Sequence, residues 1–184
     1  MIRKAAFLMV ALAATVVSAE SLEVGGKAPN FKGTGTDGKD YSLEGMKDAK
    51  AVVVCFTCNA CPTAIRYEDK FIAFAKKYQD KGVRFVAINV NPEGLDAMKE
   101  RAEEKGFPYP YIKDASGDSA RAYGAKVTPH LYVLDGGQKL AYVGAFDQGD
   151  KTYVQDAVDA VLAGSTPEVT SSRPVGCGIR PARR

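Results

Sequence analysis

The order of apolar and amphipathic segments predicts a mixed α/β domain. Three short apolar runs, rich in β-branched side chains, are typical of buried strands: residues 51–56, 83–90 and 131–135. Helical spacing of apolar positions predicts helices over residues 63–79, 95–105, 116–123 and 151–162. This alternation predicts a central mixed β-sheet with helices on both faces.

The sequence of residues 20–50 is typical of an extended, turn-rich segment before the first buried strand. Asp37-Gly38 separates two short alternating runs, which indicates an N-terminal β-hairpin. Residues 33–38 also match the Gly-x-Gly-x-x-Gly pattern of dinucleotide sites, but no helix follows them. We therefore interpret these glycines as turn residues and expect no bound cofactor.

Both ends of the chain differ from this middle part. Arg3 and Lys4 precede an apolar stretch, and the small residues Val17-Ser18-Ala19 follow it, so we predict a signal peptide over residues 1–19 that is cleaved after Ala19. An uncleaved membrane anchor is the alternative. Residues 20–163 form one predicted domain. Residues 164–184 are a Pro-, Gly- and Ser-rich tail that contains Cys177 and either packs by specific contacts or stays mobile.

The charge balance bears on possible partners. The chain has 25 Lys and Arg, 22 Asp and Glu, and a net charge of +3. The leader accounts for two of the basic residues, so the mature chain is nearly neutral. This argues against nucleic acid or an anionic membrane as the main partner. We expect a periplasmic or secreted protein with no stable membrane insertion after the signal is cleaved.

The strongest chemical motif is Cys58-Asn59-Ala60-Cys61-Pro62, which lies between the first buried strand and the first long helix. Free N–H groups and the positive end of the helix dipole stabilise a thiolate at such a position. We expect Cys58 to lie nearest the helix end and act as the nucleophile, and Cys61 to resolve the mixed disulfide.

Other interpretations of these cysteines stay open. A closed structural disulfide is one, and half of a zinc site is another, although only Cys55, Cys177 and His130 remain as further ligands. Two thiolates and an imidazole, from Cys58, Cys61 and His130, would suit Cu(I). Cys55 lies inside an apolar strand and is expected to pack in the core. Cys177 is either a relay thiol or a staple to Cys55 or to another chain.

The order of the motifs resembles the thioredoxin fold over about residues 23–163. A strand, the CxxC-Pro motif, a helix and a strand are followed by Thr128-Pro129, a hairpin and a last helix. Residues 26–31, with Asp37-Gly38, look like the redoxin and peroxiredoxin (AhpC/TSA) branch of that superfamily. The resemblance implies that Pro129 is a cis-proline opposite the CxxC and that the backbone of Thr128 pairs with a bound polypeptide.

Residues 56–62 and 173–179 together resemble a bacterial peroxiredoxin-like branch of the superfamily. Peroxiredoxins carry Pro-x-x-x-Thr-x-x-Cys, whereas here Thr57 lies four residues before Cys61 and Val54 takes the proline position. The position of the peroxidase arginine is Pro129. The resemblance therefore favours a thiol–disulfide oxidoreductase over an antioxidant thiol peroxidase. Its expected partners are a disulfide-containing protein or small thiol and an electron donor that the sequence does not name.

Overall fold

The computed structural model describes residues 22–180 of the 184. The predicted signal peptide lies outside the described residues, as do the last four residues of the tail. Within residues 22–180, no helix has both the length and the apolar character needed to cross a membrane.

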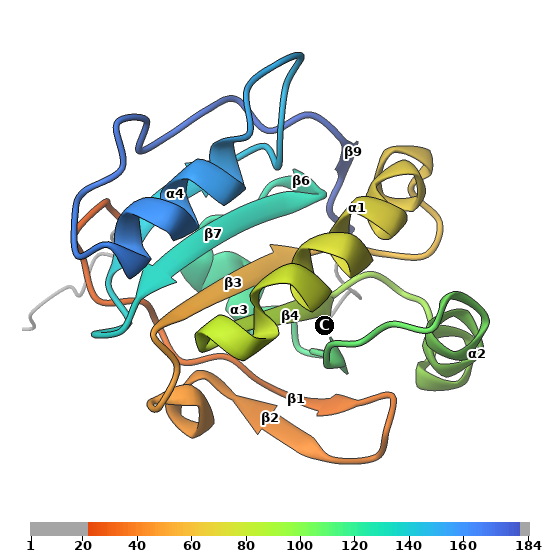
Figure 1. The fold of residues 1–184 in the computed structure, drawn as a ribbon. Coiled ribbons are helices and arrows are strands. Elements are labelled where there is room, and N and C mark those ends of the chain that lie inside the picture. Colours follow the sequence, from red (N-terminus) through yellow and green to blue (C-terminus); the bar gives the residue numbers. More distant parts are fainter. Residues whose placement is uncertain (1–21, 181–184) are drawn as a thin grey trace, which may run out of the picture.

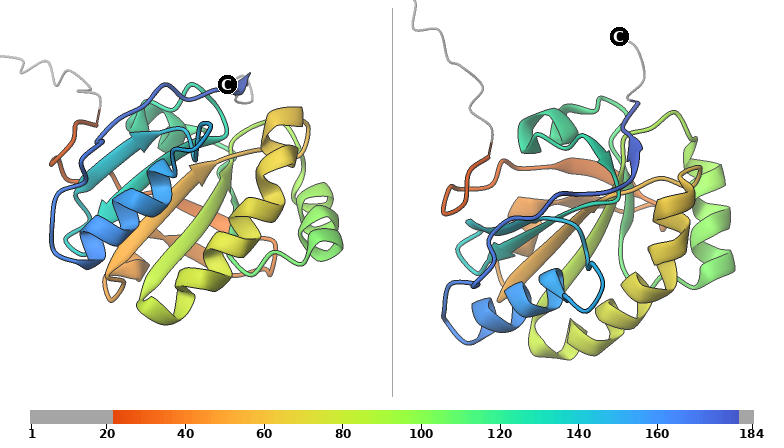
Figure 2. Two further views of the ribbon diagram at one scale, coloured as in Figure 1. Left: turned by 45° about the horizontal axis from the view of Figure 1, so that its top comes forward. Right: turned by 90° about the horizontal axis from the view of Figure 1, so that it is seen from above.

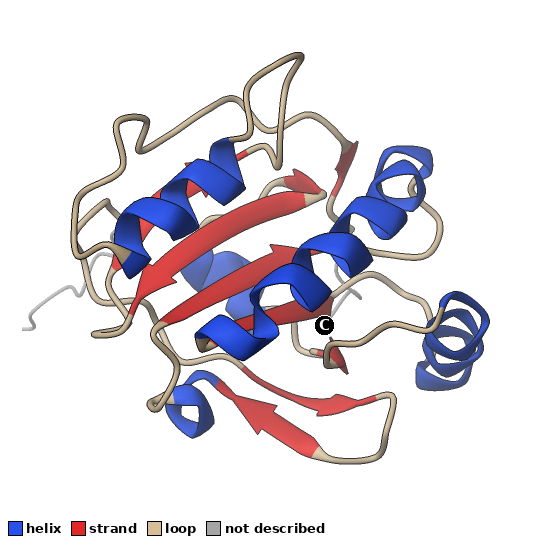
Figure 3. Ribbon diagram, in the orientation of Figure 1, coloured by secondary structure: helices blue, strands red, loops and turns tan. Residues whose placement is uncertain are grey.

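A seven-stranded mixed sheet forms the centre of the molecule (Figure 3). Its strands are β1 (Lys32–Gly35), β2 (Asp40–Ser42), β3 (Ala51–Phe56), β4 (Val83–Asn89), β5 (Tyr111–Lys113), β7 (His130–Asp135) and β8 (Leu140–Gly144). They lie in the order β2-β1-β5-β4-β3-β7-β8. The neighbours β3, β4 and β5 run parallel, and the other pairs are antiparallel. The predicted mixed sheet is confirmed.

Helices cover both faces of this sheet, as predicted. They are α1 (Pro62–Tyr78), α2 (Leu95–Lys105), α3 (Asp118–Tyr123) and α4 (Tyr153–Leu162), with short 3-10 turns at Leu43–Met46 and Gln79–Lys81. Figures 1 and 2 show α1 and α4 on one face and α3 on the other. All six residues of β3 are buried, because the strand lies mid-sheet between two apolar cores.

The N-terminal hairpin is also confirmed. Thr34 pairs with Asp40 across the turn, and Gly38 adopts a φ of 79°, which favours glycine. The Asp37 carboxylate accepts hydrogen bonds from Lys39 N at 3.1 Å and Tyr41 Oη at 2.7 Å. The glycine pattern over residues 33–38 therefore belongs to this hairpin, with Gly33 and Gly35 in β1 and Gly38 in the turn.

The C-terminal tail packs by specific contacts. After α4 the chain runs back along the sheet, where Ser171 forms a parallel bridge with Val143. It then forms the short strand β9 (Cys177–Gly178), which pairs with β6 (Val127–Thr128). β9 lies beside β6 and close to the start of α1 (Figure 1), so the tail reaches the CxxC motif.

Candidate active site

Cys61 is the residue at the N-terminus of α1. Pro62 is the first helical residue, and Cys61 is the N-cap, with extended backbone angles (φ −83°, ψ 114°). Ala64 N donates a hydrogen bond to Cys61 Sγ at 3.4 Å. Our expectation that Cys58 lies nearest the helix end is therefore wrong. Proline favours the first helical position, where no N–H is needed, and this preference could have placed Cys61 at the cap.

The thiol of Cys61 is the most activated of the four. Its Sγ lies 2.7 Å from Cys177 Sγ and 2.9 Å from the carbonyl oxygen of Thr128. Burial opposes ionisation, but the hydrogen bond between Cys61 and Cys177 and the one that Cys61 accepts from the N–H of Ala64 outweigh it and lower the pKa of Cys61 to about 7. The same hydrogen bond to Cys61 is the main cause that raises the pKa of Cys177.

Cys58 and Cys55 are less activated. Cys58 packs with Cys61 and Cys177 in one small cluster. Its Sγ lies 3.3 Å from the hydroxyl of Thr128, yet burial raises its pKa. Cys55 is wholly buried in β3, where burial raises its pKa well above the ordinary value. Cys55 therefore packs as a core side chain, as expected.

Thr128 contacts the thiols of Cys58 and Cys61 and the backbone of Cys177. The Thr128–Pro129 peptide bond is cis, as the resemblance implied. The hydroxyl of Thr128 faces Cys58, its carbonyl oxygen faces Cys61, and its backbone pairs with Cys177 across β6 and β9. The backbone position expected to bind a partner polypeptide is thus filled by this chain's own tail.

A polar network behind the CxxC loop was not foreseen from the sequence. Ala60 N donates to Glu93 Oε1 at 3.1 Å, and Asn89 Nδ2 donates to Glu93 Oε2 at 3.2 Å. Tyr111 Oη donates to Asn59 Oδ1 at 2.8 Å and accepts from Asn89 Nδ2 at 3.1 Å. The sequence offered one signal for this network. Asn59 follows β3 and Asn89 ends β4, and these neighbouring strands are parallel, so their carboxyl ends meet at one edge of the sheet.

His130 does not form a metal site with the thiols. Its Nδ1 lies 3.2 Å from Tyr132 Oη, and burial, together with the charge of Lys126, lowers the pKa of His130 to about 4. Within residues 22–180, no three His, Cys, Asp or Glu side chains gather as metal ligands. The structure therefore does not bring His130 together with Cys58 and Cys61 as a set of three ligands.

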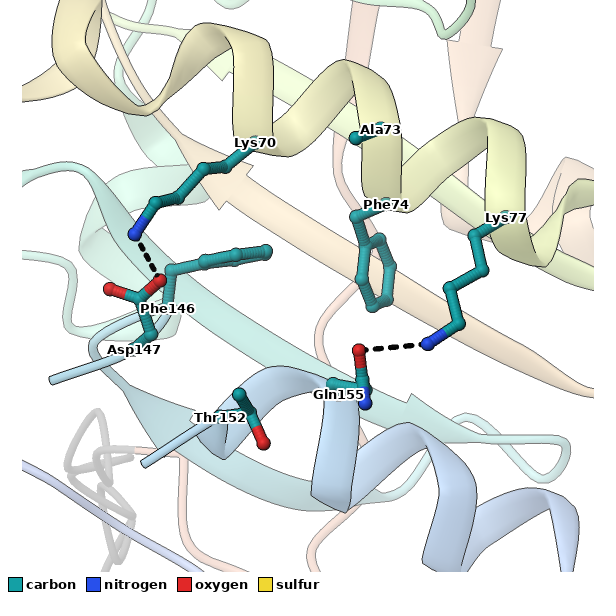
Figure 4. A pocket seen from close by; sticks show the side chains of 8 residues that line it. All are labelled: Lys70, Ala73, Phe74, Lys77, Phe146, Asp147, Thr152 and Gln155. Atoms are coloured by element: carbon teal, nitrogen blue, oxygen red, sulfur yellow. Dashed lines mark hydrogen bonds and ion pairs between the residues drawn. The ribbon is translucent and has the colours of Figure 1, made fainter. Parts of the chain in front are cut away.

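Two of the larger pockets border α1. One, of about 230 Å³, lies between α1 and α4, and no cysteine lines it (Figure 4). Two of its lining lysines already have partners, since Lys70 pairs with Asp147 at 2.6 Å and Lys77 donates to Gln155 at 2.9 Å. The other, of about 280 Å³, lies beside the thiols, and Thr63, Arg66, Pro129, Arg173 and Val175 are among its lining residues.

Comparison with known proteins places the chain in a family. A family model described as Redoxin matches residues 23–161. The chain belongs to the redoxin family. Similar curated proteins include the thiol–disulfide oxidoreductase ResA of Bacillus thuringiensis subsp. konkukian, 28% identical over 119 residues. The thiol:disulfide interchange protein DsbE of Haemophilus influenzae is 25% identical over 120 residues.

These matches cover part of each curated protein. They span 63% of this redoxin and 66% of ResA, and 65% of this redoxin and 64% of DsbE. About two thirds of the length of these relatives is therefore matched.

Solved structures match more of the chain. A hypothetical protein of Sinorhizobium meliloti is 31% identical, with a TM-score of 0.83, over 90% of this redoxin and 98% of that protein. An uncharacterized protein of Geobacillus kaustophilus is 32% identical, with a TM-score of 0.83, over 89% and 94% of the two chains. A putative DsbE of Chlorobium tepidum is 26% identical, with a TM-score of 0.69, over 77% and 99%. This redoxin therefore has a thioredoxin-like fold and belongs to the thioredoxin superfamily.

Proposed function

We propose that this redoxin is an exported thiol–disulfide oxidoreductase in which Cys61 is the nucleophile. The observation that carries the proposal is the position of the Cys61 thiol at the helix N-cap, 2.7 Å from a second thiol. A thiolate attacks a disulfide sulfur, and a neighbouring thiol then releases the partner. The names of the relatives ResA and DsbE agree with this chemistry.

The three clustered thiols have different roles in this proposal. With a pKa of about 7, Cys61 is partly thiolate at neutral pH and attacks first. Cys177 already lies against Cys61 and closes one disulfide with it. Cys58, whose pKa is raised, attacks Cys61 more slowly and closes the second disulfide, within the CxxC motif. Cys61 therefore takes part in every disulfide of the relay.

Peroxidase activity is less well supported. A peroxidase stabilises the breaking O–O bond with donors beside its cysteine. In the described part of the chain, Cys61 Sγ contacts backbone and sulfur atoms, and no arginine donates to it. Exchange between thiols and disulfides needs no such donor. The partner we propose is accordingly a disulfide-containing protein or small thiol.

Catalysed reduction of insulin disulfides by dithiothreitol tests the proposal. The wild-type protein is expected to accelerate the reaction, and Cys61→Ser is expected to abolish the acceleration. Cys55→Ala is the matched control, because Cys55 lies in the core outside the cluster. Retention of the acceleration by Cys61→Ser would overturn the assignment, and rapid consumption of hydrogen peroxide in a parallel assay would favour a peroxidase.

Export is part of the same proposal. It is supported by the basic residues, apolar stretch and small residues of the predicted leader over residues 1–19. The N-terminal sequence of the protein recovered from its native cells tests it. We expect the mature chain to begin at Glu20, and a chain that retains residues 1–19 in the cytoplasmic fraction would contradict export.

A further inference from the structure

The strand before the cis-proline, β6, is paired with a segment of the chain's own C-terminal tail. Cys177 pairs with Thr128, and Gly178 pairs with Val127, in antiparallel register. Ile179 N extends the pairing by donating to the carbonyl oxygen of Lys126 at 3.0 Å. An extended peptide that adds to an exposed strand edge binds through the same backbone hydrogen bonds. The tail is therefore bound in the manner of an extended peptide.

The register of this pairing places Cys177 next to the proposed nucleophile, Cys61. Cys177 Sγ lies 2.7 Å from Cys61 Sγ, and Cys61 Sγ also lies 2.9 Å from the carbonyl oxygen of Thr128. A partner cysteine joined to Cys61 by a mixed disulfide also has its sulfur directly beside Cys61 Sγ, at the bond length of about 2.05 Å. Cys177 thus occupies the place of a partner cysteine.

The close approach of Gly176 to the backbone of Thr128 limits which residues can occupy this edge of β6. A Cβ atom added to Gly176 would lie 2.0 Å from the carbonyl oxygen of Thr128 and 2.6 Å from its carbonyl carbon. These neighbours are backbone atoms, which cannot rotate away as a side chain does. By contrast, a Cβ added to Gly178 meets no atom within 4 Å. Only glycine fits directly before the cysteine in the observed pose.

The tail is anchored before it reaches the site. Val143 N donates to Thr170 O at 3.1 Å, and Ser172 N donates to Val143 O at 3.0 Å. The hydroxyl of Ser172 lies 2.6 Å from Tyr142 Oη and accepts from Ala145 N at 3.0 Å. Beyond this anchor, Arg173 and Val175 are exposed. Residues 177–180 are held separately, by the pairing of β9 with β6 and by Arg180 N, which donates to Asn91 Oδ1 at 2.9 Å, so the contacts at residues 170–172 do not depend on the tail's occupying β6.

We infer that residues 173–179 are an intramolecular substrate, which alternates with a partner segment at the edge of β6. This inference rests on the proposed function for its chemistry, but not for the binding itself. The partner segment is an extended polypeptide whose reactive cysteine is preceded by glycine, since it meets the Thr128 carbonyl as Gly176 does. The tail and the partner compete for one site.

The exchange balances as a two-electron transfer. With the tail displaced, Cys61 loses its hydrogen bond with Cys177 but keeps the one from Ala64 N, and its thiolate form attacks one sulfur of a partner disulfide, while the partner's other sulfur leaves as a thiolate. The Cys58 thiolate, which does not need the edge of β6, then attacks Cys61 Sγ, which breaks the mixed disulfide and releases the partner's second thiolate. The tail returns to the vacated edge, and the Cys177 thiolate attacks Cys61 Sγ and displaces Cys58 as a thiolate. The partner disulfide is reduced, the Cys61 and Cys177 dithiol is oxidised, and the two thiol protons end on the partner. Return of the tail also fills the edge of β6.

Peptide binding tests this inference without any electron transfer. The probe is a fluorescein-labelled peptide with the sequence of residues 173–179, in which serine replaces the cysteine, and anisotropy reports its binding to the reduced protein. Gly176→Ala unseats the tail, and Gly178→Ala is the matched control that leaves it seated. We expect Gly176→Ala to bind the probe at least about tenfold more tightly than the wild-type protein and Gly178→Ala, because an occupied site lowers apparent affinity by its free fraction.

A truncation after Ser172 keeps the anchor and removes the competing segment, so it is expected to show the same gain if Gly176→Ala does not fold. A second probe, with alanine in place of the first glycine, is expected not to bind. Equal affinities for the opened and wild-type proteins, no binding to the opened proteins, or equal binding of both probes would overturn the inference. If the probes behave as expected but the protein does not accelerate insulin reduction, the proposed function is wrong, whereas the inference that the tail and a partner segment compete for the edge of β6 is supported.

Discussion

Cys61 and Cys177 are 116 residues apart in the sequence, yet their sulfur atoms lie 2.7 Å apart. One cysteine caps the helix that follows the central strand, and the other lies in a tail that pairs with the strand before the cis-proline. The contact lowers the pKa of the first thiol and raises that of the second. In the proposed mechanism, this one pair of residues supplies the nucleophile, the contact that lowers its pKa and a resolving thiol.

The acidity of Cys61 is expected to depend on Cys177. In Cys177→Ala the burial of Cys61 remains but its strongest stabilising hydrogen bond is lost, so its pKa rises from about 7 toward the ordinary value of about 8.5. The pH dependence of alkylation of the Cys61 peptide by iodoacetamide, followed by mass spectrometry, measures this midpoint. Val175→Ala alters the same tail without removing the thiol and is the control. A midpoint that stays near 7 in Cys177→Ala would show that the helix terminus alone activates Cys61.

Asp114 is expected to make the stability of the fold depend on pH. Burial raises its pKa, but hydrogen bonds from Ser116, Ser119 and Gly117 outweigh burial and hold the pKa below its ordinary value. A carboxyl group with a lowered folded-state pKa stabilises the fold above its unfolded pKa, and this contribution is lost as the pH falls through the folded pKa. We expect Asp114→Asn to lower the free energy of unfolding by about 1–3 kcal/mol at neutral pH.

Urea unfolding at pH 7 and pH 3 checks this prediction. The difference between Asp114→Asn and the wild-type protein is expected to shrink at the lower pH, where the wild-type carboxylate is partly protonated. Asp150→Asn, at an exposed position, is the control. A difference that is the same at both pH values would contradict the role given to the charged carboxylate.

The ion pair between Glu68 and Arg101 joins α1 to α2. Glu68 is buried, and its two carboxylate oxygens accept from Arg101 Nε at 3.1 Å and Nη2 at 2.6 Å. Arg101→Met leaves this carboxylate buried without its partner and is expected to lower the free energy of unfolding by about 3 kcal/mol. The double variant Glu68→Met/Arg101→Met is expected to recover most of the loss. Equal stabilities for the single and double variants in urea would refute this explanation.

The central part of the fold follows from the sequence because its signals are local. The apolar run of β3, the periodicity of α1 and the Asp37-Gly38 turn each depend on residues near one another. The cis peptide at Pro129 could be predicted only from the family resemblance, since a proline before a strand does not by itself define the isomer. These elements place the CxxC motif at the correct edge of the sheet.

The details of the site depend on contacts between distant residues. The tail lacks periodicity, so nothing in residues 164–180 indicates that Cys177 pairs with Thr128. The same holds for Glu93, which reaches the backbone of Ala60 from the segment after β4. The choice between Cys58 and Cys61 at the helix cap depends on a local signal, Pro62, because proline favours the first helical position.

The central claim is that Cys61 takes part in every disulfide of the working protein. Redox titration against glutathione, with mapping of non-reduced peptides at each point, tests this claim most directly. We predict a reversible two-electron couple between about −120 and −270 mV, in which the oxidised peptides link Cys61 to Cys177 or to Cys58. A protein that oxidises with Cys61 left free, or one that accumulates sulfenate and no disulfide, would contradict the account.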